Sequence, residues 1–248
     1  MNFLTEIVLS AIIGLSIFLS YPFILMQKLN RKASLFLTAI AMGILIFLIS
    51  DIFSDVTLIL YDKTLYGYGT NLAYDILFTT SLFVGFFMLY AFEFRSKAEL
   101  KPVHISLMIS IGIGLQNLTE GLVFGSVANL IGFSGIALVI FTGFVIQNIT
   151  EGFPIGVPFF GDKSNVKSFV PLLFLIGGLP TIIGGSLGYY FNSVNFDLIF
   201  DGLAIGSILY IIIAMGAIIF RDYEKSLKGS IYIGIFSGFL IGLIVNLF

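Results

Sequence analysis

The feature that most restricts the fold of this chain is a series of long apolar segments that recurs along its whole length. Each segment is close to the ~20 residues that a helix needs to cross a bilayer. Only 10% of the residues are charged and 58% are hydrophobic, whereas a soluble domain carries about 25% charged residues. The sequence therefore predicts an all-α, polytopic membrane protein.

Eight segments of spanning length can be distinguished, joined by short connections. They form one transmembrane domain, residues 1–248, and leave no room for a separate soluble domain. The predicted spans are 4–27, 34–60, 72–93, 103–130, 133–160, 168–191, 198–220 and 230–248.

The basic residues predict the orientation of these spans. Eleven of the twelve Lys and Arg residues fall in the connections after the first, third, fifth and seventh spans, and only Lys63 lies on the other side. The first span has no basic residues before it and three after it, which is typical of an anchor and not of a signal peptide. The positive-inside rule then places both termini outside a cell membrane that the chain crosses several times.

Several aspartates fall near the outward ends of the predicted spans. Asp75, Asp197 and Asp201 are close to helix N-termini, where a carboxylate can cap the helix, or they can belong to a vestibule that concentrates cations. Asp51 and Asp55 lie instead near a helix C-terminal end, where the dipole disfavours them, and their spacing puts both on one face. For this pair we expect a water-filled entrance.

Glycines recur at a spacing of four residues, which lets helices approach closely and permits a homodimer. The sets are Gly121 and Gly125; Gly152 and Gly156; Gly184 and Gly188; and Gly234, Gly238 and Gly242. Pro154, Pro158 and Pro180 free backbone carbonyls within predicted spans, and such broken helices are expected to line a cavity.

Two matching motifs interrupt the apolar sequence of the fourth and fifth spans. Residues 116–121 read QNLTEG and residues 147–152 read QNITEG, 31 positions apart. A Glu in a span costs about 2.5–3.5 kcal/mol on insertion scales. A chain that carries this cost twice, in the same pattern, is expected to need these groups.

The spacing of the motifs also predicts a shared depth. The midpoint between Glu120 and Gln147, and between Gln116 and Glu151, falls in the turn at 129–135. In an antiparallel hairpin Glu120 then faces Gln147 and Gln116 faces Glu151, near the middle of the membrane. Two carboxylates this close repel unless one is protonated or a divalent cation lies between them. The alternative is a polar packing network without an ion.

At these residues the chain resembles the ZIP (Zrt/Irt-like) family of divalent-metal transporters, in particular its prokaryotic branch. That family has eight spans with both termini outside, a fourth-span motif HNxPEG, and a fifth-span motif of the QNIPEG or QDIPEG form. The resemblance is specific over residues 116–158. It implies a binuclear centre whose ligands are Gln116, Asn117, Glu120, Gln147, Asn148 and Glu151, and it implies metal uptake into the cytoplasm.

Three departures from the family pattern concern the metal. Gln116 replaces the family's His, Thr119 and Thr150 replace its Pro, and the sixth span has Thr181 but no acid in the relevant stretch. The only histidine, His104, lies about three turns from Gln116 and is expected at the interface. An all-oxygen site suits Mg²⁺, Mn²⁺ or Fe²⁺ better than Zn²⁺. A diverged member that no longer transports metal also fits these departures.

Other functions are less compatible with the sequence. A zinc protease of the HExxH kind needs two histidines, and an intramembrane aspartyl protease needs two facing aspartates with a GxGD motif that is absent. We therefore expect no enzyme, no organic cofactor and no nucleic-acid partner. The expected partners are the lipid bilayer and a transported Zn, Fe or Mn ion. A proton-coupled transporter of a small solute, with Glu120 and Glu151 as proton carriers, is the alternative.

Overall fold

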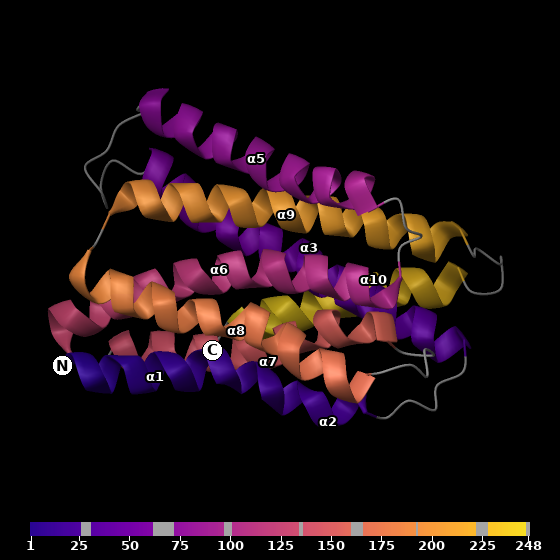
Figure 1. The fold of residues 1–248 in the computed structure, drawn as a ribbon, viewed down its shortest axis with the longest axis horizontal. Coiled ribbons are helices and arrows are strands. Elements are labelled where there is room, and N and C mark those ends of the chain that lie inside the picture. Colours follow the sequence, from indigo (N-terminus) through magenta and orange to yellow (C-terminus); the bar gives the residue numbers. More distant parts are fainter. Residues whose placement is uncertain are drawn as a thin grey trace.

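The computed structural model describes residues 1–25, 31–61, 72–96, 101–133, 136–159, 166–191, 193–221 and 228–246. These residues form an all-α bundle (Figure 1). Its long helices are α1 (Phe3–Leu15), α3 (Arg31–Tyr61), α5 (Leu72–Ser96), α6 (Pro102–Ile131), α7 (Ile136–Gly156), α8 (Val166–Tyr190), α9 (Val194–Arg221) and α10 (Lys228–Asn246). The shorter elements are η1 (Ser16–Ser20), α2 (Tyr21–Ile24) and η2 (Val157–Phe159).

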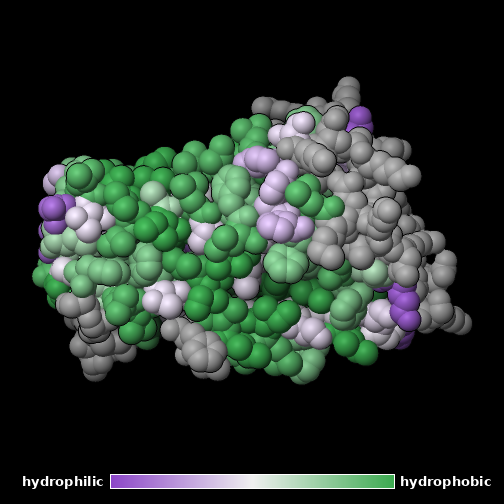
Figure 2. All heavy atoms as spheres, turned by 90° about the horizontal axis from the view of Figure 1, so that it is seen from below, coloured by the Kyte–Doolittle hydropathy of each residue, from purple (hydrophilic) through white to green (hydrophobic). Residues whose placement is uncertain are grey.

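Eight stretches of the described helices are long and apolar enough to cross a membrane, as the sequence predicts. They are Phe3–Ile24, Leu35–Tyr61, Leu72–Ala91, Pro102–Ile131, Ala137–Phe159, Ser168–Tyr190, Val194–Ala217 and Lys228–Val245. Figure 2 shows a broad apolar band across one face of the bundle, with strongly hydrophilic residues at the two ends. The chain is thus a multi-pass membrane protein whose apolar surface contacts lipid. Which end faces outward stays a prediction.

Helix α6 lies in the interior of the bundle. Nearly three quarters of its most apolar stretch is buried, a larger share than in any other described span. It packs most extensively against α8 and also contacts α9, α7 and α1, while α5 packs on α9 and α10 packs on α3. Polar groups on α6 are therefore shielded from lipid by neighbouring helices.

The glycine sets form close helix contacts, as predicted. Gly121 and Gly125 of α6 lie against the backbone of α8, and Gly152 and Gly156 of α7 lie against the first span. The α10 glycines lie against α3. In the turn after α6, Gly132 has φ 73°, which L-residues with a side chain rarely adopt. Residues 134 and 135 of the predicted turn lie outside the described residues.

The middle of the first span tightens into the 3₁₀ segment η1, where the Ser16 and Ser20 hydroxyls donate to the Ile13 and Ile17 carbonyls. One local expectation needs correction. Pro180 does not break its span, since α8 continues from Val166 to Tyr190 with this proline inside. The helix tolerates Pro180 because neighbouring groups can satisfy the backbone that a proline frees.

Candidate functional site

The two motifs meet where α6 crosses α7. The Asn117 side chain donates from Nδ2 to Asn148 Oδ1 at 2.9 Å. These residues occupy the same position in the two motifs, and each lies near the middle of its helix. Both are fully buried. The shared depth that the sequence predicts is therefore present, although the residues that meet at the crossing are the two asparagines.

Glu120 is tied to both helices. Gln116 donates to its Oε1 at 2.7 Å, and Asn148 donates to its Oε2 at 3.3 Å. The prediction that Glu120 faces Gln147 is therefore corrected, since its partner on α7 is the next residue, Asn148. The reason is the rotation of α7 about its own axis. This rotation directs Asn148 toward α6 and Gln147 toward α3 and α10.

Glu151 is the least satisfied polar side chain in this cluster. It is 1% exposed, and neither carboxylate oxygen has a hydrogen-bond partner among the described residues. The amide side chains of Gln147, Asn117 and Gln116 come near it without forming a hydrogen bond of acceptable geometry. Gln116 thus lies near Glu151, as the hairpin geometry predicts.

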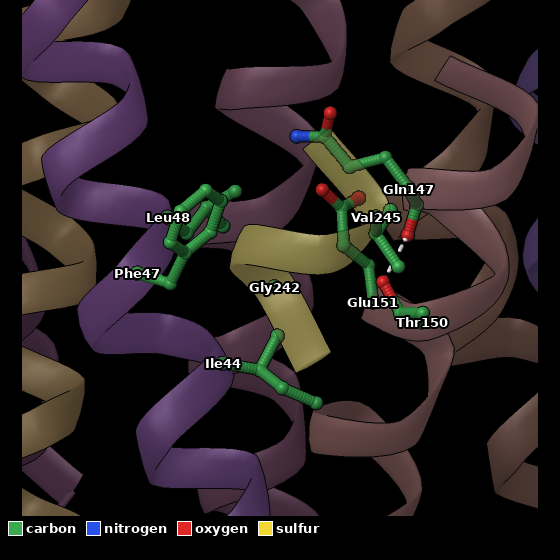
Figure 3. A pocket seen from close by; sticks show the side chains of 8 residues that line it. All are labelled: Ile44, Phe47, Leu48, Gln147, Thr150, Glu151, Gly242 and Val245. Atoms are coloured by element: carbon green, nitrogen blue, oxygen red, sulfur yellow. Dashed lines mark hydrogen bonds between the residues drawn. The ribbon is translucent and has the colours of Figure 1, made fainter. Parts of the chain in front are cut away.

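A small cavity adjoins Glu151 between α7, α3 and α10 (Figure 3). Gln147 and Glu151 extend into it from α7. It is closed by apolar side chains of α3 and by residues of α10; these are Ile44, Phe47, Leu48, Gly242 and Val245. The room for the centre of a water-sized molecule is about 10 Å³, which suits one water or one small ion. We call this space the α3–α7–α10 cavity.

Further carboxylates of α3 and α9 lie near the cluster. The charges of Asp51 and Asp55 on α3 act on Glu120, and Asp55 also acts on Asp201 of α9. Asp201 is 4% exposed and lies beside the Thr119 hydroxyl, next to Glu120 in sequence. It begins the third turn of α9, so it does not cap that helix. In the sequence, only the four-residue spacing of Asp201 from Asp197, which places both on one helix face, indicated that Asp201 could face the interior of the bundle.

Helix α8 completes the cluster from the other side of α6. Asn117 donates a second bond to the Gly177 carbonyl at 3.0 Å. One turn later the Thr181 hydroxyl is buried without a partner among the described residues. In this stretch of α8, which contains no acid, the Gly177 carbonyl is thus the group that bonds to the cluster. His104 lies in the first turn of α6, remote from the cluster.

The six predicted site residues therefore lie in one region of α6 and α7. Among the described residues, no three His, Cys, Asp or Glu side chains form a group that could hold a metal ion. The available ligands are two carboxylates and amide oxygens. Such a set can hold a hard cation through oxygen alone, with less charge than a site of three carboxylates.

Comparison with protein-family models and with curated proteins found no relative of this chain. The chain matches no protein-family model. No curated protein matches it either.

The asparagine crossing should stabilise the fold. We expect Asn148→Ala to lower the free energy of unfolding by about 1–2 kcal/mol, because it removes bonds to Asn117 and Glu120 that average ~0.6 kcal/mol each in membrane proteins and leaves an acceptor unpaired. Unfolding in mixed detergent micelles, followed by circular dichroism, measures the change. The control is Asn129→Ala, which removes an exposed bond to the Tyr189 carbonyl. Equal losses in the two variants would contradict a structural role for the crossing.

Proposed function

We propose that this protein transports a divalent metal cation through the membrane and binds it at the α6–α7 cluster. The observation that carries the proposal is a set of buried oxygens without donors. Glu151 Oε1 and Oε2, Gln116 Oε1 and Asn117 Oδ1 all lack a hydrogen-bond partner among the described residues. Buried acceptors of this kind are costly, and a cation is the partner that satisfies several of them at once.

The orientation of the amides supports a cation over an anion or a neutral solute. Gln116 Nε2 donates to Glu120, and Asn117 Nδ2 donates to Asn148 and to the Gly177 carbonyl. These acceptors fix which amide atom is nitrogen, because a carbonyl or carboxylate cannot pair with an amide oxygen. With the nitrogens so assigned, Gln116 Oε1 and Asn117 Oδ1 have no hydrogen-bond partner among the described residues, and these oxygens are available to a cation.

The size of the α3–α7–α10 cavity supports an ion over an organic solute. Its room of about 10 Å³ is far below the 300–1,000 Å³ of typical small-molecule pockets. A small organic substrate has no space beside Glu151 in this conformation. This comparison favours the cation over the proton-coupled solute transporter, which is the second candidate.

The surrounding acids suggest how a cation reaches the cluster. Asp55, Asp51 and Asp201 lie close enough for their charges to act on one another or on Glu120. A path lined by carboxylates attracts cations and raises their local concentration. We propose that these three residues form the entrance, with Thr119 at its inner end.

We further propose that the chain is a diverged member of the ZIP family. The QNLTEG and QNITEG motifs, the eight spans and the arrangement of basic residues support this. Both termini would then lie outside, and the metal would move toward the cytoplasm. The transported ion is of the Zn, Fe or Mn class, and the oxygen ligands favour Mn²⁺ or Fe²⁺ within it. The glycine faces leave room for a homodimer.

Equilibrium binding tests the site before transport is considered. Purified protein in nanodiscs should bind Mn²⁺, Fe²⁺, Co²⁺ or Zn²⁺ in isothermal titration, and binding should fall at least about 100-fold in Glu151→Gln, since changes in outer-shell ligands alone cost 10–100-fold. Glu6→Gln is the matched control, because it neutralises another buried glutamate outside the cluster. A wild-type protein that binds none of these metals would refute the proposal and favour the solute transporter.

A further inference from the structure

A second buried carboxyl group lies apart from the α6–α7 cluster, on α1. Glu6 is 0% exposed, and the Ser10 hydroxyl donates to its Oε1 at 2.5 Å. Its Oε2 is buried and has no hydrogen-bond partner among the described residues. Glu6 is not among the groups whose charges act on Glu120 and Glu151.

Glu6 and Ser10 are held tightly against α8. A Cβ on Gly185 would overlap both Glu6 Oε1 and Ser10 Oγ, so the glycine provides the space that these side chains fill. One turn earlier on α8, Thr181 lies beside Gly14 of α1 and has a buried hydroxyl without a partner among the described residues. A divalent metal ion needs several oxygen ligands and the room for them, whereas a proton needs a single oxygen and little room.

Within the described helices that pack on α1, no basic side chain faces Glu6 to balance its charge. The helices that pack on α1 are α8, α7 and α6. Their segments at this end, residues 178–190, 136–146 and 121–131, contain no Lys, Arg, His, Asp or Glu. The nearby titratable groups are Tyr189, whose hydroxyl donates to the Met1 carbonyl, Tyr190, whose ring contacts Phe3, and the N-terminal amine.

The helix dipole does not replace a counter-ion here. Glu6 is the fourth residue of α1, and Asn2 already caps the first turn by accepting from the Thr5 amide at 2.8 Å. The Glu6 carboxyl is directed along the helix to Ser10, away from the free amides of the first turn. A charged carboxylate without a cation in apolar surroundings is strongly disfavoured. The neutral acid is the form that these contacts can hold.

We propose that Glu6 is a second ion-binding site of this protein and that its ligand is a proton. The proton is carried on Oε2 and leaves to water at the end of the bundle where α1 begins. When the O–H bond breaks, both bonding electrons stay on the carboxylate, and the Ser10 hydrogen bond to Oε1 remains in place. Release of the proton therefore keeps the Ser10 hydrogen bond but leaves a negative charge on Glu6 within the α1–α8 contact.

The position of Glu6 against α8 links its protonation to the central cluster, so that transport would depend on protons. Glu6 and Thr181 belong to the same α1–α8 interface, and Gly177 of α8 accepts from Asn117 in the central cluster. Release of the Glu6 proton leaves a charge in this interface and opposes its close packing. This dependence rests on the proposed metal transport, whereas protonation of Glu6 does not.

Infrared spectroscopy tests the proton site independently of metal. In acid-minus-base difference spectra of the protein in lipid bilayers, the wild type should show a carboxylic-acid C=O band that disappears in Glu6→Gln. Ser10→Ala should shift this band, because it removes the hydrogen bond to Oε1. The control Asp75→Asn neutralises an acid at one end of α5 and should leave the band unchanged. A Glu6 contribution seen only in carboxylate bands at every pH, or identical wild-type and Glu6→Gln spectra, would overturn the proposal.

Transport measurements test the coupling. In proteoliposomes with an inward proton gradient, wild-type metal uptake should be stimulated several-fold, and Glu6→Gln should bind metal normally but lose that stimulation. If Glu6 had only a structural role, Glu6→Gln would retain the stimulation of uptake by the proton gradient. Equal stimulation in both proteins would overturn the coupling. If the wild type binds and moves no metal while the Glu6 band is present, the proposed function fails and the proton site stands.

Discussion

Glu151→Gln should reduce the initial rate of metal uptake into proteoliposomes by at least about 100-fold, because it removes a charge and an oxygen ligand from the site. The same substitution should not lower stability. Neither oxygen of Glu151 makes a hydrogen bond with the described residues, so the amide loses no protein partner. It also removes a buried carboxylate that only a cation or a proton can neutralise. We therefore expect an unchanged or higher melting temperature together with the loss of uptake.

Glu120→Gln is to be compared with Glu151→Gln, because the two substitutions should have different effects on stability. It should also abolish uptake, but it replaces an acceptor of bonds from Gln116 and Asn148 and so should lower stability as well. Uptake of ⁵⁴Mn²⁺ or ⁵⁵Fe²⁺ and thermal unfolding by circular dichroism, measured on the same preparations, separate the two effects. Wild-type uptake in both variants would show that metal does not pass through this cluster.

Gly125→Val should cause the largest loss of stability. A Cβ at this position would lie 2.8 Å from Gly185 C and 2.9 Å from Tyr189 N. Both are backbone atoms of α8, which cannot rotate away as a side chain can. Overpacking typically costs 1–3 kcal/mol and sometimes more, and we expect about 3 kcal/mol or a failure to fold. The free energy of unfolding in detergent, followed by circular dichroism, measures this loss.

The chain contains a matched control for that substitution. Gly143 of α7 is also a helical glycine, and a Cβ there would meet nothing within 4 Å. Gly143→Val should therefore change the free energy of unfolding only slightly, within about 0.5 kcal/mol, as expected for surface substitutions. If the two valine variants were equally stable, the close contact of α6 with α8 would not be a major determinant of the fold.

Much of the architecture could be predicted because the bilayer leaves few choices. A run of about 20 apolar residues must form a helix that satisfies its own backbone, so the eight spans were predicted to within a few residues of the helices. The equal depth of the two motifs followed from their distances to one turn, a property of any antiparallel hairpin. Gln116 accordingly lies near Glu151.

The sequence alone thus determined how many helices cross the membrane and which polar groups share a level. Tertiary structure alone decided how each helix is rotated and which neighbours it meets. That choice made Asn148, and not Gln147, the partner of Glu120, and it brought Asp201 of α9 to the Thr119 side of the cluster. It also buried Glu6 against Gly185. The physical reason is that rise along a helix is fixed by the backbone, whereas rotation about its axis is set by long-range packing of glycines and side chains from distant parts of the chain.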